Sequence, residues 1–184
     1  MFEACRVNLS NSTGIVQWML NSAWPSLYWQ LYDYDKMPTS AYYGVKKANK
    51  PLQLIYNYGD NGIYAVNESL INVENCKAHI RIYDIRSKLI DEHIIKVNLK
   101  DNTAAGILKL DLLRQNLFVS MELRDISGRI IADNFYAVSH IQDEYDWGAT
   151  NWMRTPLIAY NDFKDLAALS AVRLEHAVQR EEKR

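Results

Sequence analysis

The sequence is poor in cysteine, proline and glycine, and it has no long apolar run. Its 184 residues include 2 cysteines, 4 prolines and 7 glycines. Cys5 and Cys76 lie far apart and belong to no CxxC or Cys/His cluster, which argues against a disulfide framework and a zinc site. No apolar run approaches the roughly 20 residues of a membrane span, and the first ten residues lack the pattern of a signal peptide. We therefore expect no membrane partner.

An excess of charge of either sign is also missing. The chain has 21 Lys and Arg against 22 Asp and Glu, for a formal net charge of -1. Proteins that bind phosphate backbones usually gather a clear excess of basic residues, whereas the basic residues here are scattered among acids. The sequence therefore predicts no nucleic-acid partner.

Familiar catalytic and nucleotide-binding patterns are absent as well. The four histidines occur singly, without a neighbouring Ser or Cys nucleophile, and there is no GxGxxG or GxxxxGK[ST] motif. A retaining glycosidase needs two carboxylates about 5 to 5.5 Å apart, and no isolated pair stands out in this sequence. We assign no catalytic residue to the chain and predict no metal and no organic cofactor.

A β-rich pattern begins after Pro51. Short runs rich in β-branched and aromatic residues alternate with turn signals, which are clearest at residues 59–62 and at Ser127-Gly128. The pattern predicts strands at residues 52–58, 63–67, 78–84, 92–99, 105–110, 117–124 and 130–138. Seven antiparallel strands in about 90 residues favour an immunoglobulin-like β-sandwich, which we place at residues 51–141.

The first 50 residues have a different character. Residues 15–20 form a short apolar run that suits a strand buried on both faces, although a buried helix fits this length as well. Ser40 stands where a helix N-cap would, and Pro51 ends that helix. Three of the five tryptophans lie here: Trp18, Trp24 and Trp29. Such aromatics serve in cores or interfaces more often than in ligand contacts, so sugar binding is the less frequent alternative.

The last part of the chain, residues 142–184, is polar and irregular. It includes Trp147, Trp152 and Pro156 and ends in a charge run at residues 180–184, which is typical of a solvated surface. We interpret this part as a linker followed by the start of a further domain or by a tail.

Several long motifs resemble the end of the catalytic barrel in glycoside hydrolase family 2. The first is GIVQWMLNSAWPS at residues 14–26, continued by WQLYDY at residues 29–34. Further motifs keep the same order: AYYGVKKANKPL at residues 41–52, DNFY at residues 133–136 and WMRTP at residues 152–156. The similarity covers about residues 2 to 169 and is greatest to the branch of exo-β-D-glucosaminidases and β-mannosidase-like enzymes.

This resemblance implies the C-terminal part of a retaining glycosidase that acts on β-linked glucosamine or mannose. Residues 1–50 would then be the last βα unit of a (β/α)8 barrel, with residues 15–20 as its eighth strand and residues 41–50 as its eighth helix. The family's catalytic carboxylates come from the fourth and seventh strands, upstream of Met1, so the chain alone is expected to be inactive. The family also suggests a secreted or periplasmic location.

The resemblance also suggests which residues meet the sugar. Active sites of such barrels lie at the C-terminal ends of the strands, which places Trp18, Asn21 and Trp24 near the sugar subsite. The two tryptophans would be stacking walls and Asn21 a hydroxyl partner. The partners implied are a carbohydrate substrate and the rest of the barrel. Because one strand and one helix cannot close an eight-stranded barrel, residues 1–40 are also expected to self-associate.

Two alternatives to an enzyme part stay open. The sandwich could be a spacer that positions neighbouring domains, or a carbohydrate-binding module. A binding module would present a flat line of exposed aromatics on one sheet. The candidates for that line are Tyr58, Tyr64, Tyr83 and Tyr136.

Overall fold

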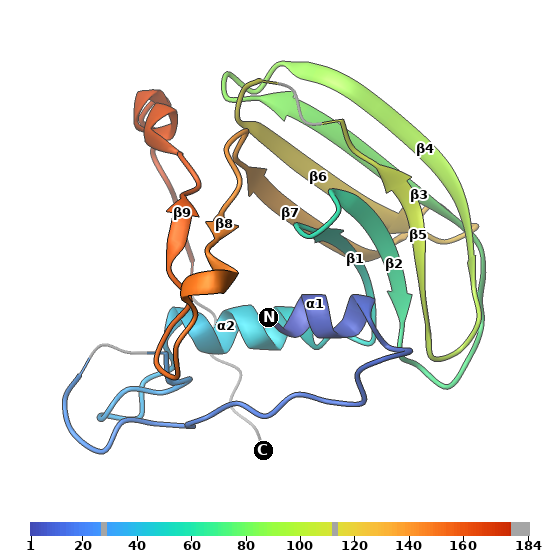
Figure 1. The fold of residues 1–184 in the computed structure, drawn as a ribbon. Helices are drawn as coiled ribbons and strands as arrows, with labels where there is room; N and C mark the ends of the chain where they lie inside the picture. The colour runs from blue at the N-terminus through green and yellow to red at the C-terminus, as the bar shows by residue number, and fades with distance from the viewer. Residues whose placement is uncertain (27–28, 112–113, 178–184) are drawn as a thin grey trace.

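Two antiparallel sheets pack face to face in the computed structural model, which describes residues 1–26, 29–111 and 114–177 (Figure 1). One sheet has the order β1-β2-β5 and the other β4-β3-β6-β7. The strands are β1 (Leu52–Asn57), β2 (Gly62–Asn67), β3 (Val73–Asp84), β4 (Leu89–Leu99), β5 (Thr103–Lys109), β6 (Leu117–Arg124) and β7 (Ile130–Val138). This arrangement confirms the predicted immunoglobulin-like sandwich of seven antiparallel strands.

The core lies between the two sheets and follows the period of two seen in the sequence. Along β6, Leu117, Val119, Met121 and Leu123 are buried, whereas the residues between them are partly exposed. They join one hydrophobic cluster with residues of the other sheet such as Leu54. Full burial of each such side chain contributes about 1.5–3 kcal/mol, so this alternation accounts for the pairing of the two sheets.

Strands β3 and β4 extend beyond their predicted limits. β3 begins at Val73 rather than at residue 78, and β4 at Leu89 rather than at residue 92. Their ladder runs from the pair Val73–Leu99 to the pair Tyr83–Leu89. Most of the added residues are exposed and only half of them are polar, so backbone pairing continues beyond the regular hydrophobic alternation that predicts a strand.

The N-terminal part contains two helices and a long irregular loop. Helix α1 (Phe2–Val7) and helix α2 (Ser40–Ala48) lie at one end of the sandwich in Figure 1. Helix α2 confirms the helix predicted here, but its N-cap is Thr39 rather than Ser40. The predicted strand at residues 15–20 is wrong, because these residues have no strand pairing. Asn21 and Tyr32 form only an isolated bridge. A barrel strand is held by hydrogen bonds to two neighbouring strands, and the described residues provide neither neighbour.

A small hairpin follows the sandwich and stands beside it in Figure 1. It is formed by β8 (Glu144–Tyr145) and β9 (Leu157–Ala159), with the 3-10 helix η1 (Trp147–Ala149) after β8 and η2 (Lys164–Ala168) beyond β9. This segment is therefore more ordered than the predicted linker. Across the residues that the structure describes, we find no helix with the length and apolar character needed to cross a membrane.

An ion-pair cluster on the outer face of the second sheet gives stability a pH dependence. Both Arg81 and Arg124 donate hydrogen bonds to the Glu122 carboxylate, at 2.8 and 2.6 Å. The hydrogen bond from Arg124 and the charge of Arg81 lower the pKa of Glu122 below its ordinary value of 4.5. Because the pKa is lower in the folded state, this stabilisation is present above the unfolded pKa and disappears as the pH falls through the folded pKa.

Glu122→Gln is therefore expected to lower the free energy of unfolding by about 1 kcal/mol at pH 7 and by less at pH 3. Urea unfolding at both pH values measures the difference. Glu74→Gln, at an exposed glutamate of β3, is the control and should have little effect at either pH. An equal loss at both pH values for Glu122→Gln would contradict the ion-pair explanation.

Candidate functional site

Helix α1 is fixed to the sandwich by a buried arginine. The Arg6 side chain is only 5% exposed, and its guanidinium donates to Glu68 Oε2 at 2.7 Å and to Gln53 Oε1 at 2.6 Å. It also donates to the main-chain oxygens of Ala48 and Pro51, at the end of α2 and just before β1. One side chain thus joins α1, the end of α2 and the first sheet.

A carboxylate on the same helix makes the second set of contacts. Glu3 Oε2 accepts a hydrogen bond from the Tyr136 hydroxyl at 2.8 Å, and Glu3 Oε1 accepts from Gln53 and Asn134 at 3.2 Å each. Burial, reinforced by the charge of Glu3, raises the pKa of Tyr136, so this hydroxyl stays protonated and remains a donor. We call Glu3, Arg6, Gln53, Asn134 and Tyr136 the α1 anchor.

The α1 anchor bears on the prediction that residues 1–40 self-associate. The helical residues Phe2–Val7 are packed on the sandwich rather than left exposed. The loop after them keeps exposed apolar side chains, which include Val16 and Leu20. Self-association through these residues stays a prediction, and it concerns the loop rather than α1.

The three predicted sugar contacts, Trp18, Asn21 and Trp24, lie on that loop and are exposed. The tryptophans are 74% and 69% exposed, respectively. The loop has some internal support, because the Trp29 indole N–H donates to the Trp18 carbonyl oxygen at 2.6 Å and Asn21 donates to the Ser22 carbonyl oxygen at 3.1 Å. The three residues thus lie exposed on one loop, and their contact with a sugar stays a prediction.

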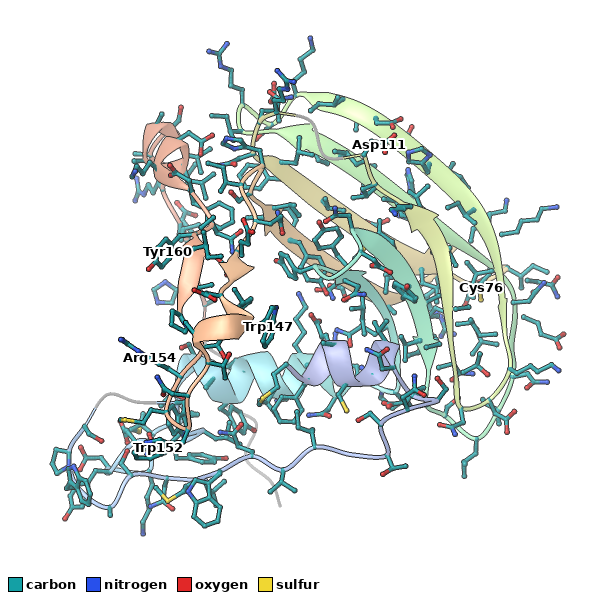
Figure 2. All side chains as sticks on the ribbon, in the orientation of Figure 1. Cys76, Asp111, Trp147, Trp152, Arg154 and Tyr160 are labelled. Atoms are coloured by element: carbon teal, nitrogen blue, oxygen red, sulfur yellow. The ribbon has the colours of Figure 1, made fainter. Side chains whose placement is uncertain are left out.

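Exposed tryptophans are a general feature of this molecule. Trp147 on η1 is 73% exposed and Trp152 is 91% exposed, and both lie in the segment that follows the sandwich (Figure 2). Tryptophan is mostly buried in folded proteins, and groups of large apolar side chains on a surface mark sites of interaction. Trp147 lies beside the ring of Tyr145 and lines a cleft, so among these two residues it is Trp147 that indicates a surface of this kind.

The tyrosines proposed for a binding module do not form a flat exposed line. Tyr136 points into the interior and packs against Tyr56 and Tyr58, with ring centroids 5.8 and 6.3 Å apart, respectively. Tyr64 is partly buried and donates its hydroxyl hydrogen to Asp60. Among the residues that the structure describes, these four tyrosines therefore do not form the flat exposed line that this alternative needs.

The described ranges contain no group of three or more His, Cys, Asp or Glu side chains placed to hold a metal ion.

Asn134 and Gln53 are two buried polar residues that the sequence analysis did not single out. Both occupy strand positions of the interior, where a polar residue needs a hydrogen-bond partner, and this is the signal that could have pointed to a buried network. Nothing in the sequence shows that the partner is Glu3, 131 residues before Asn134.

The described residues thus form an immunoglobulin-like β-sandwich, and α1 anchors an N-terminal extension to it. Residues 60–143 match the family described as the Mannosidase Ig/CBM-like domain. The matched residues include β2 to β7 of the sandwich.

The relatives extend the similarity beyond the sandwich. The chain is 30% identical over 169 residues to an exo-β-D-glucosaminidase of Hypocrea jecorina, covering 89% of this chain and 19% of the relative. The crystal structure of the Amycolatopsis orientalis exo-chitosanase CsxA matches with a TM-score of 0.85 at 30% identity, over 91% of this chain and 21% of that one. A β-D-mannosidase from Dictyoglomus thermophilum, at 23% identity and a TM-score of 0.58, shares the fold over 74% of this chain and 17% of its own. The chain thus spans about a fifth of the length of its curated relatives.

Proposed function

We propose that the chain is the C-terminal part of a retaining glycosidase that acts on β-linked glucosamine, with β-linked mannose as the alternative substrate. The observation that carries this proposal is the extent of the structural similarity to the exo-chitosanase, which covers 91% of the chain. That coverage is greater than residues 60–143, the part that matches the family of sandwich domains. The N-terminal helices and loop therefore belong to the same functional unit as the sandwich.

In this proposal the sandwich is a rigid platform for the substrate-binding loop. The α1 anchor fixes α1 on β1 and β7, and Arg6 also holds the end of α2, which closes the loop on its other side. The loop between these helices carries Trp18, Asn21 and Trp24 as one wall of the sugar subsite. The wall contributes stacking and a hydrogen-bonding amide, while the two carboxylates that break the glycosidic bond come from upstream residues.

The test compares the 184-residue chain with a longer protein in which a complete barrel precedes Met1. Hydrolysis of p-nitrophenyl β-glucosaminide and of p-nitrophenyl β-mannoside is expected only from the longer protein, with the glucosaminide the better substrate. Activity in the short chain would contradict the proposal and would direct attention to the carboxylates of Glu3, Asp33 and Asp35 in the N-terminal part. Inactivity of the longer, folded protein on both substrates would favour the alternative of a non-catalytic spacer.

A further inference from the structure

A cleft separates the start of the sandwich from the hairpin that follows it. Its volume is about 640 Å³, and its lining includes Tyr58 at the end of β1, Gln142 and Asp143 before β8, and Tyr145, Trp147 and Asn161 from the hairpin segment. Pockets of about 300–1,000 Å³ suit small ligands. The loop with Trp18 and Trp24 does not contribute to this lining, so the cleft is distinct from the proposed substrate wall.

Two aromatic rings form a platform in the cleft. The centroids of Tyr145 and Trp147 are 5.3 Å apart and their planes are tilted by 33°. The residues are 44% and 73% exposed, so much of their ring surface is open, and in Figure 2 Trp147 extends from η1 towards the sandwich. Aromatic faces of this kind can pack on the apolar C–H face of a sugar ring, and they also attract cations.

The backbone below the platform is held by hydrogen bonds. Tyr145 pairs with Leu157 across the hairpin, and the Asp146 amide donates to the Pro156 carbonyl oxygen at 2.9 Å. The Asp146 side chain in turn accepts from the Ala149 amide at 3.0 Å, which caps η1. The two rings are therefore positioned before any ligand arrives, which reduces the entropy lost on binding.

The charge of the cleft is negative. Asp143 is exposed and its Oδ1 accepts a hydrogen bond from the Asn161 main-chain amide at 2.8 Å, which orients the carboxylate and leaves Oδ2 for a ligand. The lining residues include no lysine or arginine. A protonated amine beside this carboxylate would make a charge-assisted hydrogen bond, which is about twice as strong as a neutral one.

We propose that this cleft binds a glucosamine unit of a β-linked amino-sugar oligosaccharide. Tyr145 and Trp147 stack on the sugar ring, and the Asp143 carboxylate binds its ammonium group. The choice of an amino sugar as the ligand rests on the proposed function, whereas the aromatic platform and the carboxylate follow from the contacts of the cleft. It predicts that an oligomer with free amines binds more tightly than its N-acetylated counterpart, which has the same apolar face but no charge.

The experiment titrates the 184-residue chain at pH 6 with a glucosamine tetramer and with an N-acetylglucosamine tetramer, by calorimetry. Trp147→Ala is expected to weaken binding of the amine form at least tenfold. Asp143→Asn can still accept the hydrogen bond from Asn161, and it is expected to reduce the affinity for the amine form to that for the acetylated form. Trp152→Ala removes a more exposed tryptophan outside the lining and is the matched control, with no change expected.

Several results would overturn the inference. Failure of the glucosamine tetramer to bind the unmodified chain would remove the site, and equal affinity for the two tetramers would remove the role of Asp143. A larger loss with Trp24→Ala than with Trp147→Ala would show that the oligosaccharide binds the N-terminal loop instead. If Trp147→Ala does not fold, as judged by circular dichroism, the charge-specific effect of Asp143→Asn still decides the question.

Discussion

Replacement of Arg6 by alanine is expected to lower the free energy of unfolding by about 3 kcal/mol or more. The guanidinium is 5% exposed and provides hydrogen bonds to Glu68, to Gln53 and to two main-chain carbonyl oxygens. Its removal leaves these acceptors without their donors, several of them away from water. Because one side chain joins three elements, alanine also removes the link between α1 and the end of α2.

Arg129→Ala is the matched control for this experiment. Arg129 pairs with Asp125 at 3.1 Å, but its side chain is 78% exposed. An exposed ion pair of this kind contributes about 0.2–1 kcal/mol, so the control should change stability much less. Urea unfolding at pH 7, followed by circular dichroism, measures both variants. Similar losses for Arg6→Ala and Arg129→Ala would show that the α1 anchor does not stabilise the fold.

The sandwich was predictable from the sequence because its strands carry the signal themselves. Along β6 the alternation of apolar and polar residues largely matches the alternation of buried and partly exposed positions. In β7 burial also alternates, but polar Asn134 is buried and Phe135 is exposed. The turn at Ser127-Gly128 was equally clear, since Gly128 has a φ of 82° that disfavours residues with a side chain. The largest differences are at the starts of β3 and β4, where mostly exposed residues continue the ladder. β5 also begins earlier than predicted, at Thr103 rather than at residue 105.

The N-terminal part was harder to predict because its structure depends on distant residues. An apolar run such as residues 15–20 indicates burial, but it cannot show whether the partner strands are present. Glu3 and Arg6 belong to a short helix whose position is fixed by Gln53, Asn134 and Tyr136. These contacts span 47 to 133 positions in sequence, and no local pattern encodes them.

The sequence analysis did not predict the cleft between Tyr58 and the hairpin, for a related reason. Tyr145 and Trp147 are separated by one residue, and in a regular strand this spacing would place both rings on one face. In the sequence, however, they stand in a polar segment that has no strand-like alternation. The β8–β9 pairing, which reaches Ala159, and the cap that Asp146 makes with Ala149 bring them together. The two aromatic residues can be seen in the sequence, but their arrangement as one side of a cleft depends on the β8–β9 hairpin.

Replacement of Trp18 and Trp24 by alanine, in a protein that joins this chain to a complete upstream barrel, is expected to lower kcat/KM well over tenfold. This corresponds to a loss above about 1.4 kcal/mol of transition-state binding. Both side chains are largely exposed in the chain itself, at 74% and 69%, so their removal should leave its fold intact. The loss then reports contact with the sugar or with the barrel that shapes the subsite.

Trp152→Ala in the same protein separates a subsite effect from a general effect of losing an exposed tryptophan, because Trp152 is 91% exposed and lies outside the N-terminal loop. Initial rates with p-nitrophenyl β-glucosaminide give kcat and KM for each variant, and thermal unfolding shows whether the fold is retained. Trp18 and Trp24 form a wall of the subsite if the rate falls in their variants while Trp152→Ala keeps full activity. An unchanged rate in a folded Trp18→Ala, Trp24→Ala double variant would remove both residues from the site.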